Sequence, residues 1–213
     1  MAWHRTTSPP ASLVIIGFTV LIYFLQNSAF VETLRLFALW PLDTPDQLRF
    51  GQAVLNTGFS WWQLISYGFL HGGWAHLFFN MFALYMFGLP IERAWGTKRF
   101  VYFYFICLVG AGLVQLSVAQ LSGEVYPTIG ASGAVFGVLL AFGMMFPNTR
   151  LMLLFPPIPI KAKWFVLGYG ALTLVFGVTG TMSGVAHFAH LGGMLFGLAL
   201  ILYWGRQDHR RRG

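Results

Sequence analysis

The chain has 213 residues, of which 57% are hydrophobic and only 9% charged, whereas about 25% of the residues in an ordinary soluble domain are charged. With 22 Phe, 8 Trp and 8 Tyr, it carries more apolar surface than a particle of this size can hide from water. The composition therefore excludes a water-soluble globular protein and indicates that lipid is the solvent. Thirteen Lys and Arg against six Asp and Glu give a formal net charge of +7, which by itself fits a nucleic acid, an acidic partner or anionic lipid.

The first apolar stretch, about residues 11–30, follows Arg5 and has the character of either a cleaved signal peptide or a membrane span. Asn27-Ser28-Ala29 is a poor cleavage site, so we expect the span to be retained. The longest connection, residues 31–74, comes next and carries the pair Trp61-Trp62. We expect it to be partly helical and to lie at the membrane interface, anchored by its aromatic rings.

Five further charge-poor stretches approach the roughly 20 residues needed to cross a bilayer. They fall at about residues 75–91, 100–119, 132–147, 164–180 and 185–204. The sequence therefore predicts an all-α membrane protein, a six-transmembrane-helix bundle in which residues 1–213 form a single membrane domain. The one cysteine, Cys107, lies in an apolar run, so we expect no disulfide and no metal site, and nothing indicates a cofactor.

Positive side chains alternate between the two sides of these spans. The tails with the second and fourth loops hold all but two of the 13 Lys and Arg. Because cytoplasmic segments carry the excess of positive charge, both termini are expected in the cytoplasm. The arginines after residue 205 are then expected to contact membrane lipid, with no nucleic-acid partner. The short loops favour a bacterial inner membrane.

In this topology the second, fourth and sixth spans all run inward, so their first residues share one membrane depth. Polar side chains gather there: His76 and Asn80 in the second span, Ser132 in the fourth, His187 and His190 in the sixth. Singly, such residues are usually packing residues, because serine bonds to the backbone in membrane helices. Three sets at one depth instead predict a polar pocket, and ionisable groups inside a bilayer suggest a functional site.

Glycine spacing indicates which of these helices approach each other. Two G-x-x-x-G pairs occur, one on the fourth span and one on the sixth: Gly133 with Gly137, and Gly193 with Gly197. Such pairs permit close backbone contact in membranes, although they also occur for packing alone. Ser132 and His190 each precede one pair, so the hydroxyl and the imidazole come within hydrogen-bond reach if those faces meet.

A serine hydroxyl becomes an effective nucleophile when a neutral histidine takes its proton. No acidic residue lies near this depth, so the residues predict a Ser-His dyad. Periodicity does not choose between His187 and His190, but the glycine context favours His190. His76 and Asn80, four residues apart on one helix face, present two donors to the same point, as the developing oxyanion of an acyl transfer requires.

These motifs resemble those of the rhomboid family of intramembrane serine proteases, and the resemblance covers essentially the whole chain. The four motifs stand in the family's order: H-x-x-x-N at residues 76–80, E-x-x-x-G at 92–96, G-x-S-G at 130–133 and A-H-x-x-G-x-x-x-G at 189–197. The resemblance implies the rhomboid fold. It also implies hydrolysis of a peptide bond in or beside the transmembrane segment of another membrane protein, near the outer face.

By this resemblance Ser132 would be the nucleophile, and His190 the general base and then the acid. His76 and Asn80, with the backbone amide of Ser132, would form the oxyanion hole. Phe136 would stack on the base, where many relatives have tyrosine.

One departure from the family lies in the first loop. Relatives often carry Trp-Arg there, and this chain has Trp62-Gln63, so the arginine thought to brace the loop is missing. Glu92 is expected to bond to loop donors around Gly96. The fifth loop is expected to move as a cap because it is glycine-rich: Gly177, Gly180 and Gly184 surround Thr179, Thr181 and Ser183.

Two other functions compete with the protease. A catalytically silent rhomboid-like module would bind membrane proteins, but such relatives lack the serine or the histidine, and both are present here. A small transporter or proton channel would carry charged side chains and broken helices at the midplane. Here the polar residues crowd the outer third of the spans, so the protease is the function we expect.

Overall fold

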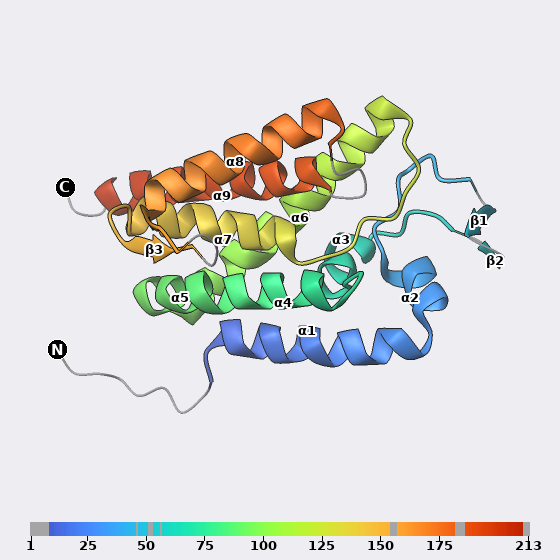
Figure 1. The fold of residues 1–213 in the computed structure, drawn as a ribbon, viewed down its shortest axis with the longest axis horizontal. Helices are drawn as coiled ribbons and strands as arrows, with labels where there is room; N and C mark the ends of the chain where they lie inside the picture. Colours follow the sequence, from blue (N-terminus) through green and yellow to red (C-terminus); the bar gives the residue numbers. More distant parts are fainter. Residues whose placement is uncertain are drawn as a thin grey trace.

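The computed structural model describes residues 9–45, 47–50, 53–55, 57–153, 157–181 and 186–210. Parts of two predictions lie outside these residues, namely Arg5, Arg211 and Arg212 of the charge pattern and Ser183 and Gly184 of the loop cap. Within them the protein is helical apart from two short hairpins (Figure 1). The helices are α1 (Ala11–Ser28), α2 (Phe30–Phe37), α3 (Gln63–Ser66), η1 (Tyr67–Phe69), α4 (Trp74–Ala83), η2 (Leu84–Gly88), α5 (Leu89–Trp95), α6 (Thr97–Ser122), α7 (Ser132–Met145), α8 (Ala162–Thr179) and α9 (His187–Arg210). The strands are β1 (Leu48–Phe50), β2 (Ala53–Leu55), β3 (Arg150–Met152) and β4 (Pro159–Lys161).

Five of the described helical segments are long and apolar enough to cross a membrane: α1, the run from Trp74 to Trp95, α6, α8 and α9. The prediction of a helical membrane protein is confirmed by these five segments. The fourth predicted span, 132–147, corresponds to α7, which has only 14 residues. That length is about 21 Å at 1.5 Å per residue, which is less than the roughly 30 Å of a bilayer's hydrocarbon core.

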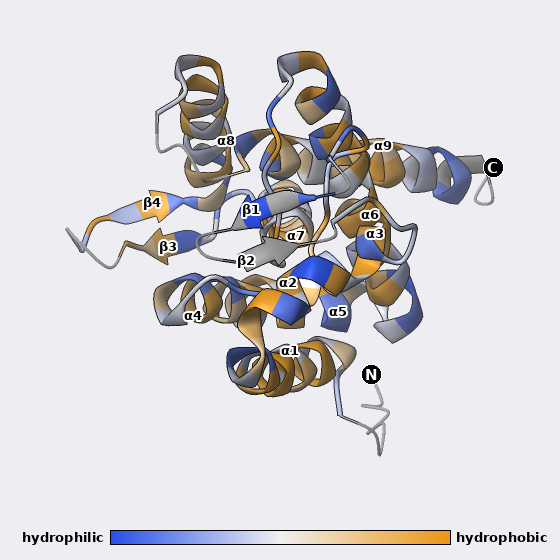
Figure 2. Cartoon of the chain, turned by 90° about the vertical axis from the view of Figure 1, so that its right-hand side faces the viewer, coloured by the Kyte–Doolittle hydropathy of each residue, from blue (hydrophilic) through white to orange (hydrophobic). Residues whose placement is uncertain are grey.

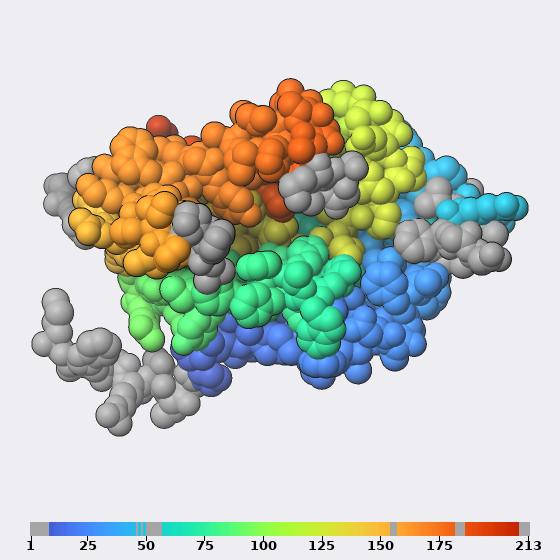
Figure 3. All heavy atoms as spheres, viewed as in Figure 1, coloured from blue at the N-terminus to red at the C-terminus, as the bar shows by residue number. Residues whose placement is uncertain are grey.

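α7 lies inside the bundle, where its small residues, among them Gly133, Gly137 and Gly143, let the neighbouring helices pack closely against it. Ten of its fourteen residues are buried, and it contacts α6, α8 and α9. Figure 3 shows its neighbourhood only as a strip of yellow atoms between the green atoms of α4 and the orange atoms of α8. The outer helices are also largely hydrophobic (Figure 2), but many of their apolar side chains are exposed. Leu21 on α1 and Leu167 on α8 are examples, more than half exposed, as expected of helices that face lipid.

The two glycine pairs bring α7 and α9 together backbone to backbone. A Cβ atom added to Gly193 would lie 1.8 Å from the carbonyl oxygen of Gly133, and one added to Gly137 would lie 3.0 Å from that of Gly193. A Cβ on Gly197 would lie 3.4 Å from the Cα of Gly137. No larger residue fits at Gly193 without moving the helices apart, so these glycines set the distance between α7 and α9.

The second membrane span changes its helical geometry in the middle. α4 continues into the single π-helical turn η2 and then into α5, where Pro90 is the second residue. Proline lacks an N–H group, and its ring collides with the carbonyl four residues earlier. A π-turn directly before it relieves that collision and keeps the run from Trp74 to Trp95 continuous.

Glu92 joins the beginnings of α1 and α6. Its carboxylate accepts hydrogen bonds from the backbone N–H of Ala11 (2.7 Å) and of Ser12 (2.9 Å), and from the hydroxyls of Ser12 (2.7 Å) and Thr97 (2.9 Å). Thr97 follows Gly96, where partners were expected. Most of the hydrogen bonds to Glu92 come from the start of α1. A carboxylate at a helix N-terminus accepts from otherwise unpaired N–H groups and interacts favourably with the helix dipole.

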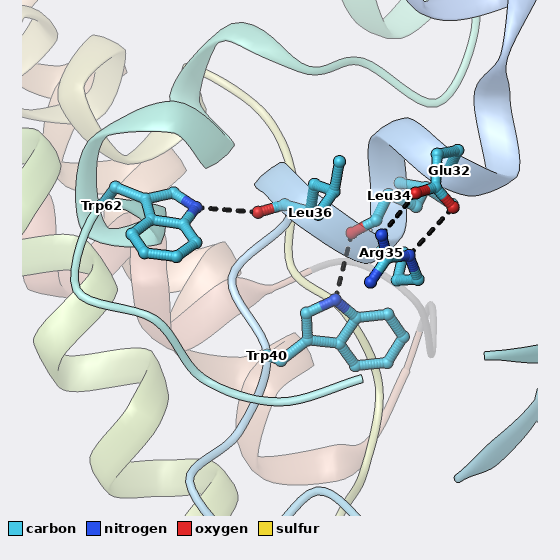
Figure 4. A network of polar contacts seen from close by, with 6 residues as sticks. All are labelled: Glu32, Leu34, Arg35, Leu36, Trp40 and Trp62. Carbon is cyan, nitrogen blue, oxygen red and sulfur yellow. Dashed lines mark hydrogen bonds and ion pairs between the residues drawn. The ribbon is translucent and has the colours of Figure 1, made fainter. Parts of the chain in front are cut away.

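The connection before α4 is partly helical, containing α2, α3 and η1. Two tryptophan side chains tie it together by donating to carbonyls of α2: Trp40 Nε1 to Leu34 O (3.0 Å) and Trp62 Nε1 to Leu36 O (2.9 Å) (Figure 4). Trp40 is fully buried, whereas Trp61 is 74% exposed. Trp61 and Trp62, which is 41% exposed, are therefore tryptophan rings of this connection that are free to meet the membrane interface.

Gln63 supports this connection where relatives often have arginine. Its side chain is buried; Oε1 accepts from the backbone N–H of Trp40 at 3.2 Å, and Nε2 donates to the carbonyl of Gly58 at 3.0 Å. A neutral amide thus joins two distant points of the connection.

The predicted loop cap is wrong in part. Gly177 and Thr179 belong to α8, which ends at Gly180, where φ is +68°. A Cβ on Gly177 would lie 3.2 Å from the Cβ of His187 and 3.3 Å from the ring of Phe188. The glycine there allows α8 to pack closely on the start of α9 and does not provide loop flexibility.

Candidate active site

Ser132 and His190 touch across the contact between α7 and α9. Ser132 Oγ and His190 Nε2 are 2.7 Å apart, although 58 positions separate the two residues in the chain. Ser132 is the first residue of α7, and His190 lies in the first turn of α9. Because the glycines that follow each of them bring the backbones together, a short hydroxyl and an imidazole reach each other without a longer side chain.

Phe136 fixes the plane of the His190 ring. The two rings are stacked, with centroids 4.3 Å apart and planes 7° apart. On its other side Phe136 stacks on Tyr169 of α8 at 4.9 Å. Phe136 was expected beside the base, whereas no sequence signal pointed to Tyr169, because an aromatic residue in an apolar span is ordinary.

His187, the other candidate on α9, does not share this contact with Ser132. Its ring is nearly perpendicular to that of His190, with centroids 6.2 Å apart. Its Nε2 lies 3.1 Å from the carbonyl oxygen of Thr181, just after α8. The structure therefore pairs Ser132 with His190 and leaves His187 at the end of α8.

His76 faces the same space as Ser132. A Cβ on Gly130 would lie 2.7 Å from His76 Nε2 and 3.8 Å from Ser132 Oγ. Gly130 has φ +120°, which L side chains rarely adopt. The backbone N–H of Gly72 lies 3.4 Å from His76 Nδ1. A neutral ring that accepts at Nδ1 carries its proton on Nε2, so a donor lies beside Ser132.

Asn80 lies one turn further along α4 and is buried. One N–H of its side chain donates to the carbonyl of His76 at 2.9 Å. The structure thus places Asn80 against the backbone that carries His76, with one N–H left for another acceptor.

Behind His76 lies His71, which is fully buried. The two rings are 4.9 Å apart, and His71 Nε2 has no hydrogen-bond partner in the part of the chain that the structure describes. Burial, followed by the nearby His76, lowers the pKa of His71 to about 3. His71 is therefore neutral at ordinary pH.

Gln26 of α1 holds the turn that carries His71, a role that sequence reasoning missed. Its side chain donates from Nε2 to the carbonyl of His71 and accepts at Oε1 from the N–H of His71, at 2.5 and 3.1 Å. The available signal was an amide inside an otherwise apolar span, which lipid tolerates only when the amide is paired.

The donor set does not suggest a metal site. Among the residues described, no group of three or more His, Cys, Asp or Glu side chains could hold a metal ion. Glu92, the carboxylate nearest in sequence to the His76 motif, is taken up by α1 and Thr97. What the arrangement offers is acyl-transfer chemistry: a hydroxyl in contact with an imidazole, and a second imidazole as donor beside it.

Comparison with known protein families agrees with the resemblance that the sequence motifs indicate. The family model of the rhomboid domain matches residues 58–207, well over half of the chain. The chain therefore belongs to the rhomboid family, and the predicted family membership is confirmed.

Several characterised relatives are similar over much of the chain. "Rhomboid protein 1, mitochondrial" of Saccharomyces cerevisiae is 30% identical over 151 residues, covering 70% of this chain and 43% of the yeast protein. "Rhomboid protease GluP" of Bacillus subtilis is 32% identical over 140 residues, 64% of this chain and 25% of that protein. "Rhomboid protease GlpG" of Serratia proteamaculans is 26% identical over 211 residues, 98% of this chain and 66% of that protein. The chain thus spans less than half the length of the first two relatives.

Proposed function

We propose that this protein is an intramembrane serine endopeptidase that cleaves transmembrane segments of other membrane proteins with a Ser132-His190 dyad. The observation that supports this most directly is the 2.7 Å separation of Ser132 Oγ and His190 Nε2. Two of the relatives carry the word protease in their names, which supports the same reaction class.

In the proposed reaction Ser132 Oγ forms a bond to the carbonyl carbon of the scissile peptide while its proton passes to His190 Nε2. The C–N bond then breaks, and the same proton moves to the departing amine. Water then bonds to the acyl carbon of the ester left on Ser132 and gives a proton to His190; the bond between that carbon and Ser132 Oγ breaks, and His190 returns the proton to the serine oxygen. The stack between Phe136 and His190 keeps the imidazole in one orientation through both transfers.

The carbonyl oxygen becomes negatively charged in each half of this reaction and needs hydrogen-bond donors. We assign that task to His76 Nε2 and the backbone N–H of Ser132, with Asn80 as a further donor. The position of His76 Nε2 beside Gly130 supports the assignment, and the bond from Asn80 to the carbonyl of His76 gives Asn80 a second task in holding that turn.

We place the cleavage near the outer face of the membrane, with both chain termini in the cytoplasm. The excess of Lys and Arg in the tails and in the second and fourth loops supports this orientation. A substrate helix has to unwind locally, because a carbonyl inside a helix is already hydrogen-bonded and shielded. Substrates with small or helix-breaking residues near the outer face are therefore expected to be cleaved best. The bacterial inner membrane stays a prediction, since the relatives include a mitochondrial protein.

A fluorophosphonate probe tests the nucleophile directly. The purified full-length chain is expected to be labelled at Ser132, with loss of labelling in Ser132→Ala and in His190→Ala. His187→Ala is the matched control, because His187 lies one turn earlier on α9 and does not contact Ser132. Labelling that survives in His190→Ala, or disappears equally in His187→Ala, would remove the dyad.

Cleavage of a single-span substrate separates the protease from a silent binding module. Ser132→Ala should still bind the substrate but leave it intact, whereas Asn80→Ala should reduce turnover by less, because one donor of several is lost. A wild-type chain that binds a range of substrates and cleaves none would favour the binding module.

A further inference from the structure

The hairpin between α7 and α8 carries an exposed cationic face. β3 and β4 are antiparallel, with Arg150 opposite Lys161 and Met152 opposite Pro159. Because alternate residues of a strand share a face, these four side chains lie on one side of the ribbon, and all four are exposed. Leu151 lies on the other side and packs against the hydrophobic core.

The pairing of Arg150 with Lys161 is unfavourable by itself. Like charges directly opposite each other on antiparallel strands repel, since their Cβ atoms are only about 5 Å apart. The ion pairs found in the described part of the chain are Glu32 with Arg35 and Arg99 with Asp208, so neither cation of the ribbon is neutralised by a described carboxylate. An anion between the two would convert the repulsion into attraction.

Two large apolar side chains close to this cationic pair in the chain are exposed. Met152, on the same face of the ribbon, is 64% exposed, and Trp164, three residues after Lys161 in α8, is 60% exposed. Lys163 Nζ lies 5.2 Å from the centre of the Trp164 ring, which adds a third positive charge beside the aromatic surface. Cations beside exposed apolar and aromatic side chains match an amphiphile with an anionic head and a hydrocarbon tail.

The ribbon also lies where such a molecule would be. It is at the same end of the bundle as the first residue of α1 and the last turn of α9 (Figure 1), and it contacts α8. Seen along the bundle, β3 and β4 project sideways beyond the helices, at a height between α8 and α4 (Figure 2). The ribbon therefore projects from the side of the bundle at the end where α8 begins, a position from which it could reach lipid headgroups.

We propose that this ribbon binds the headgroup of an anionic phospholipid, with the phosphate between Arg150 and Lys161 and an acyl chain over Met152 and Trp164. An acidic peptide would satisfy the two cations but would leave the neighbouring apolar side chains uncovered, so the observations favour lipid. This site is independent of the proposed protease activity, because none of its residues belongs to the pocket around Ser132.

The test uses the full-length chain in phosphatidylcholine vesicles with increasing amounts of phosphatidylglycerol carrying brominated acyl chains, which quench nearby tryptophan. Subtracting the signal of Trp164→Phe isolates Trp164. We expect brominated phosphatidylglycerol to quench Trp164 at a lower membrane fraction than brominated phosphatidylcholine. The variant Arg150→Gln/Lys161→Gln removes both cations. The membrane fraction of brominated phosphatidylglycerol that gives a set degree of Trp164 quenching should then rise about fivefold for each charge removed.

Arg93→Gln/Lys98→Gln is the matched control, because it removes two exposed cations from α5 and α6 outside the ribbon. This control should leave the quenching curve unchanged. An equal shift in both double variants would mean that overall surface charge causes the preference for phosphatidylglycerol, and it would overturn the proposed binding site. Equal quenching by the two lipids would also overturn it. So would displacement of the lipid by inorganic phosphate or by a polyglutamate peptide at matched charge concentration.

A thermal midpoint in pure phosphatidylcholine vesicles checks that Arg150→Gln/Lys161→Gln is folded. Because neutralisation removes the repulsion between Arg150 and Lys161, its thermal midpoint there should equal or exceed that of the wild type. Lys161→Arg, which keeps the charge, should keep the preference for phosphatidylglycerol. Loss of the preference in Lys161→Arg as well would contradict a site that recognises charge.

Discussion

Gln26 pairs both backbone polar groups of His71 with one side chain, although 45 positions separate the two residues. α1 lies along one edge of the bundle in Figure 1, and this contact connects it to the turn from which α4 begins. His76 lies one turn into α4 and faces Ser132 across Gly130. A helix at the edge of the bundle thus positions a residue of the proposed oxyanion hole.

Gln26→Leu should therefore reduce both stability and turnover. Leaving two buried backbone groups unpaired costs about 1–3 kcal/mol each, which lowers the thermal midpoint in detergent. Displacement of the turn should reduce kcat about tenfold with little change in KM, since none of the residues proposed to act on the scissile peptide lies on α1. Ser28→Ala is the control, because its exposed hydroxyl bonds only within its own helix. A variant with wild-type kcat and a lowered midpoint would give Gln26 a purely structural role.

Gly130→Ala should strongly reduce cleavage by moving His76. The new Cβ would lie 2.7 Å from His76 Nε2, and loss of one oxyanion donor typically reduces kcat about a hundredfold or more. Gly123→Ala provides the comparison: Gly123 also has positive φ, at +71°, but a Cβ there meets nothing within 4 Å. Backbone strain of about 1–2 kcal/mol is then the main cost, so Gly123→Ala should keep its kcat. Equal losses of kcat in the two variants would mean that strain alone is responsible.

The sequence predicts five of the six expected spans and the close contact between α7 and α9, for physical reasons. Each span is a long apolar run, and lipid permits only a helix there. Two glycine pairs, each beside a polar residue, indicate that α7 and α9 meet at Gly133 and Gly193. The short length of α7 is less visible, because the apolar run continues through Phe146 and only the chain's turn toward β3 ends the helix.

Other features depend on tertiary contacts that no local pattern encodes. Gln26 and Gln63 are single amides whose partners lie 45 and 23 positions away. The apolar span around Gln26 indicates that its amide is paired, but the sequence does not indicate with which group. The β3–β4 ribbon has strands of only three residues in a proline-rich segment, where propensity disfavours strands. Tyr169 contacts Phe136 only because α8 packs on α7.

The buried His71 should make the fold sensitive to acid. Its pKa is about 3 in the folded protein and about 6.5 in an unfolded chain. Between these values the unfolded chain binds the extra proton, so the free energy of unfolding falls as the pH drops below about 6.5. At pH 5 the loss is about 2 kcal/mol. Thermal midpoints at pH 7 and pH 5 should therefore differ more in the wild type than in His71→Leu; parallel shifts would assign the acid sensitivity to other groups.

Glu92→Gln should destabilise the fold while sparing the chemistry. Oε1 accepts from Ala11 N–H and the Thr97 hydroxyl, and Oε2 accepts from the N–H and hydroxyl of Ser12. Whichever way the glutamine amide turns, its NH₂ group faces one backbone N–H donor, from Ala11 or Ser12, while the hydroxyl beside it can turn to accept. The expected loss in the free energy of unfolding is about 1–3 kcal/mol. Glu92 and His76 are about 24 Å apart along their helical run, so kcat per folded molecule should stay at the wild-type value. Glu32→Gln, which removes an exposed pair with Arg35, should barely change the midpoint. A midpoint as high in Glu92→Gln as in Glu32→Gln would show that the contact between α1 and α5 contributes little to stability.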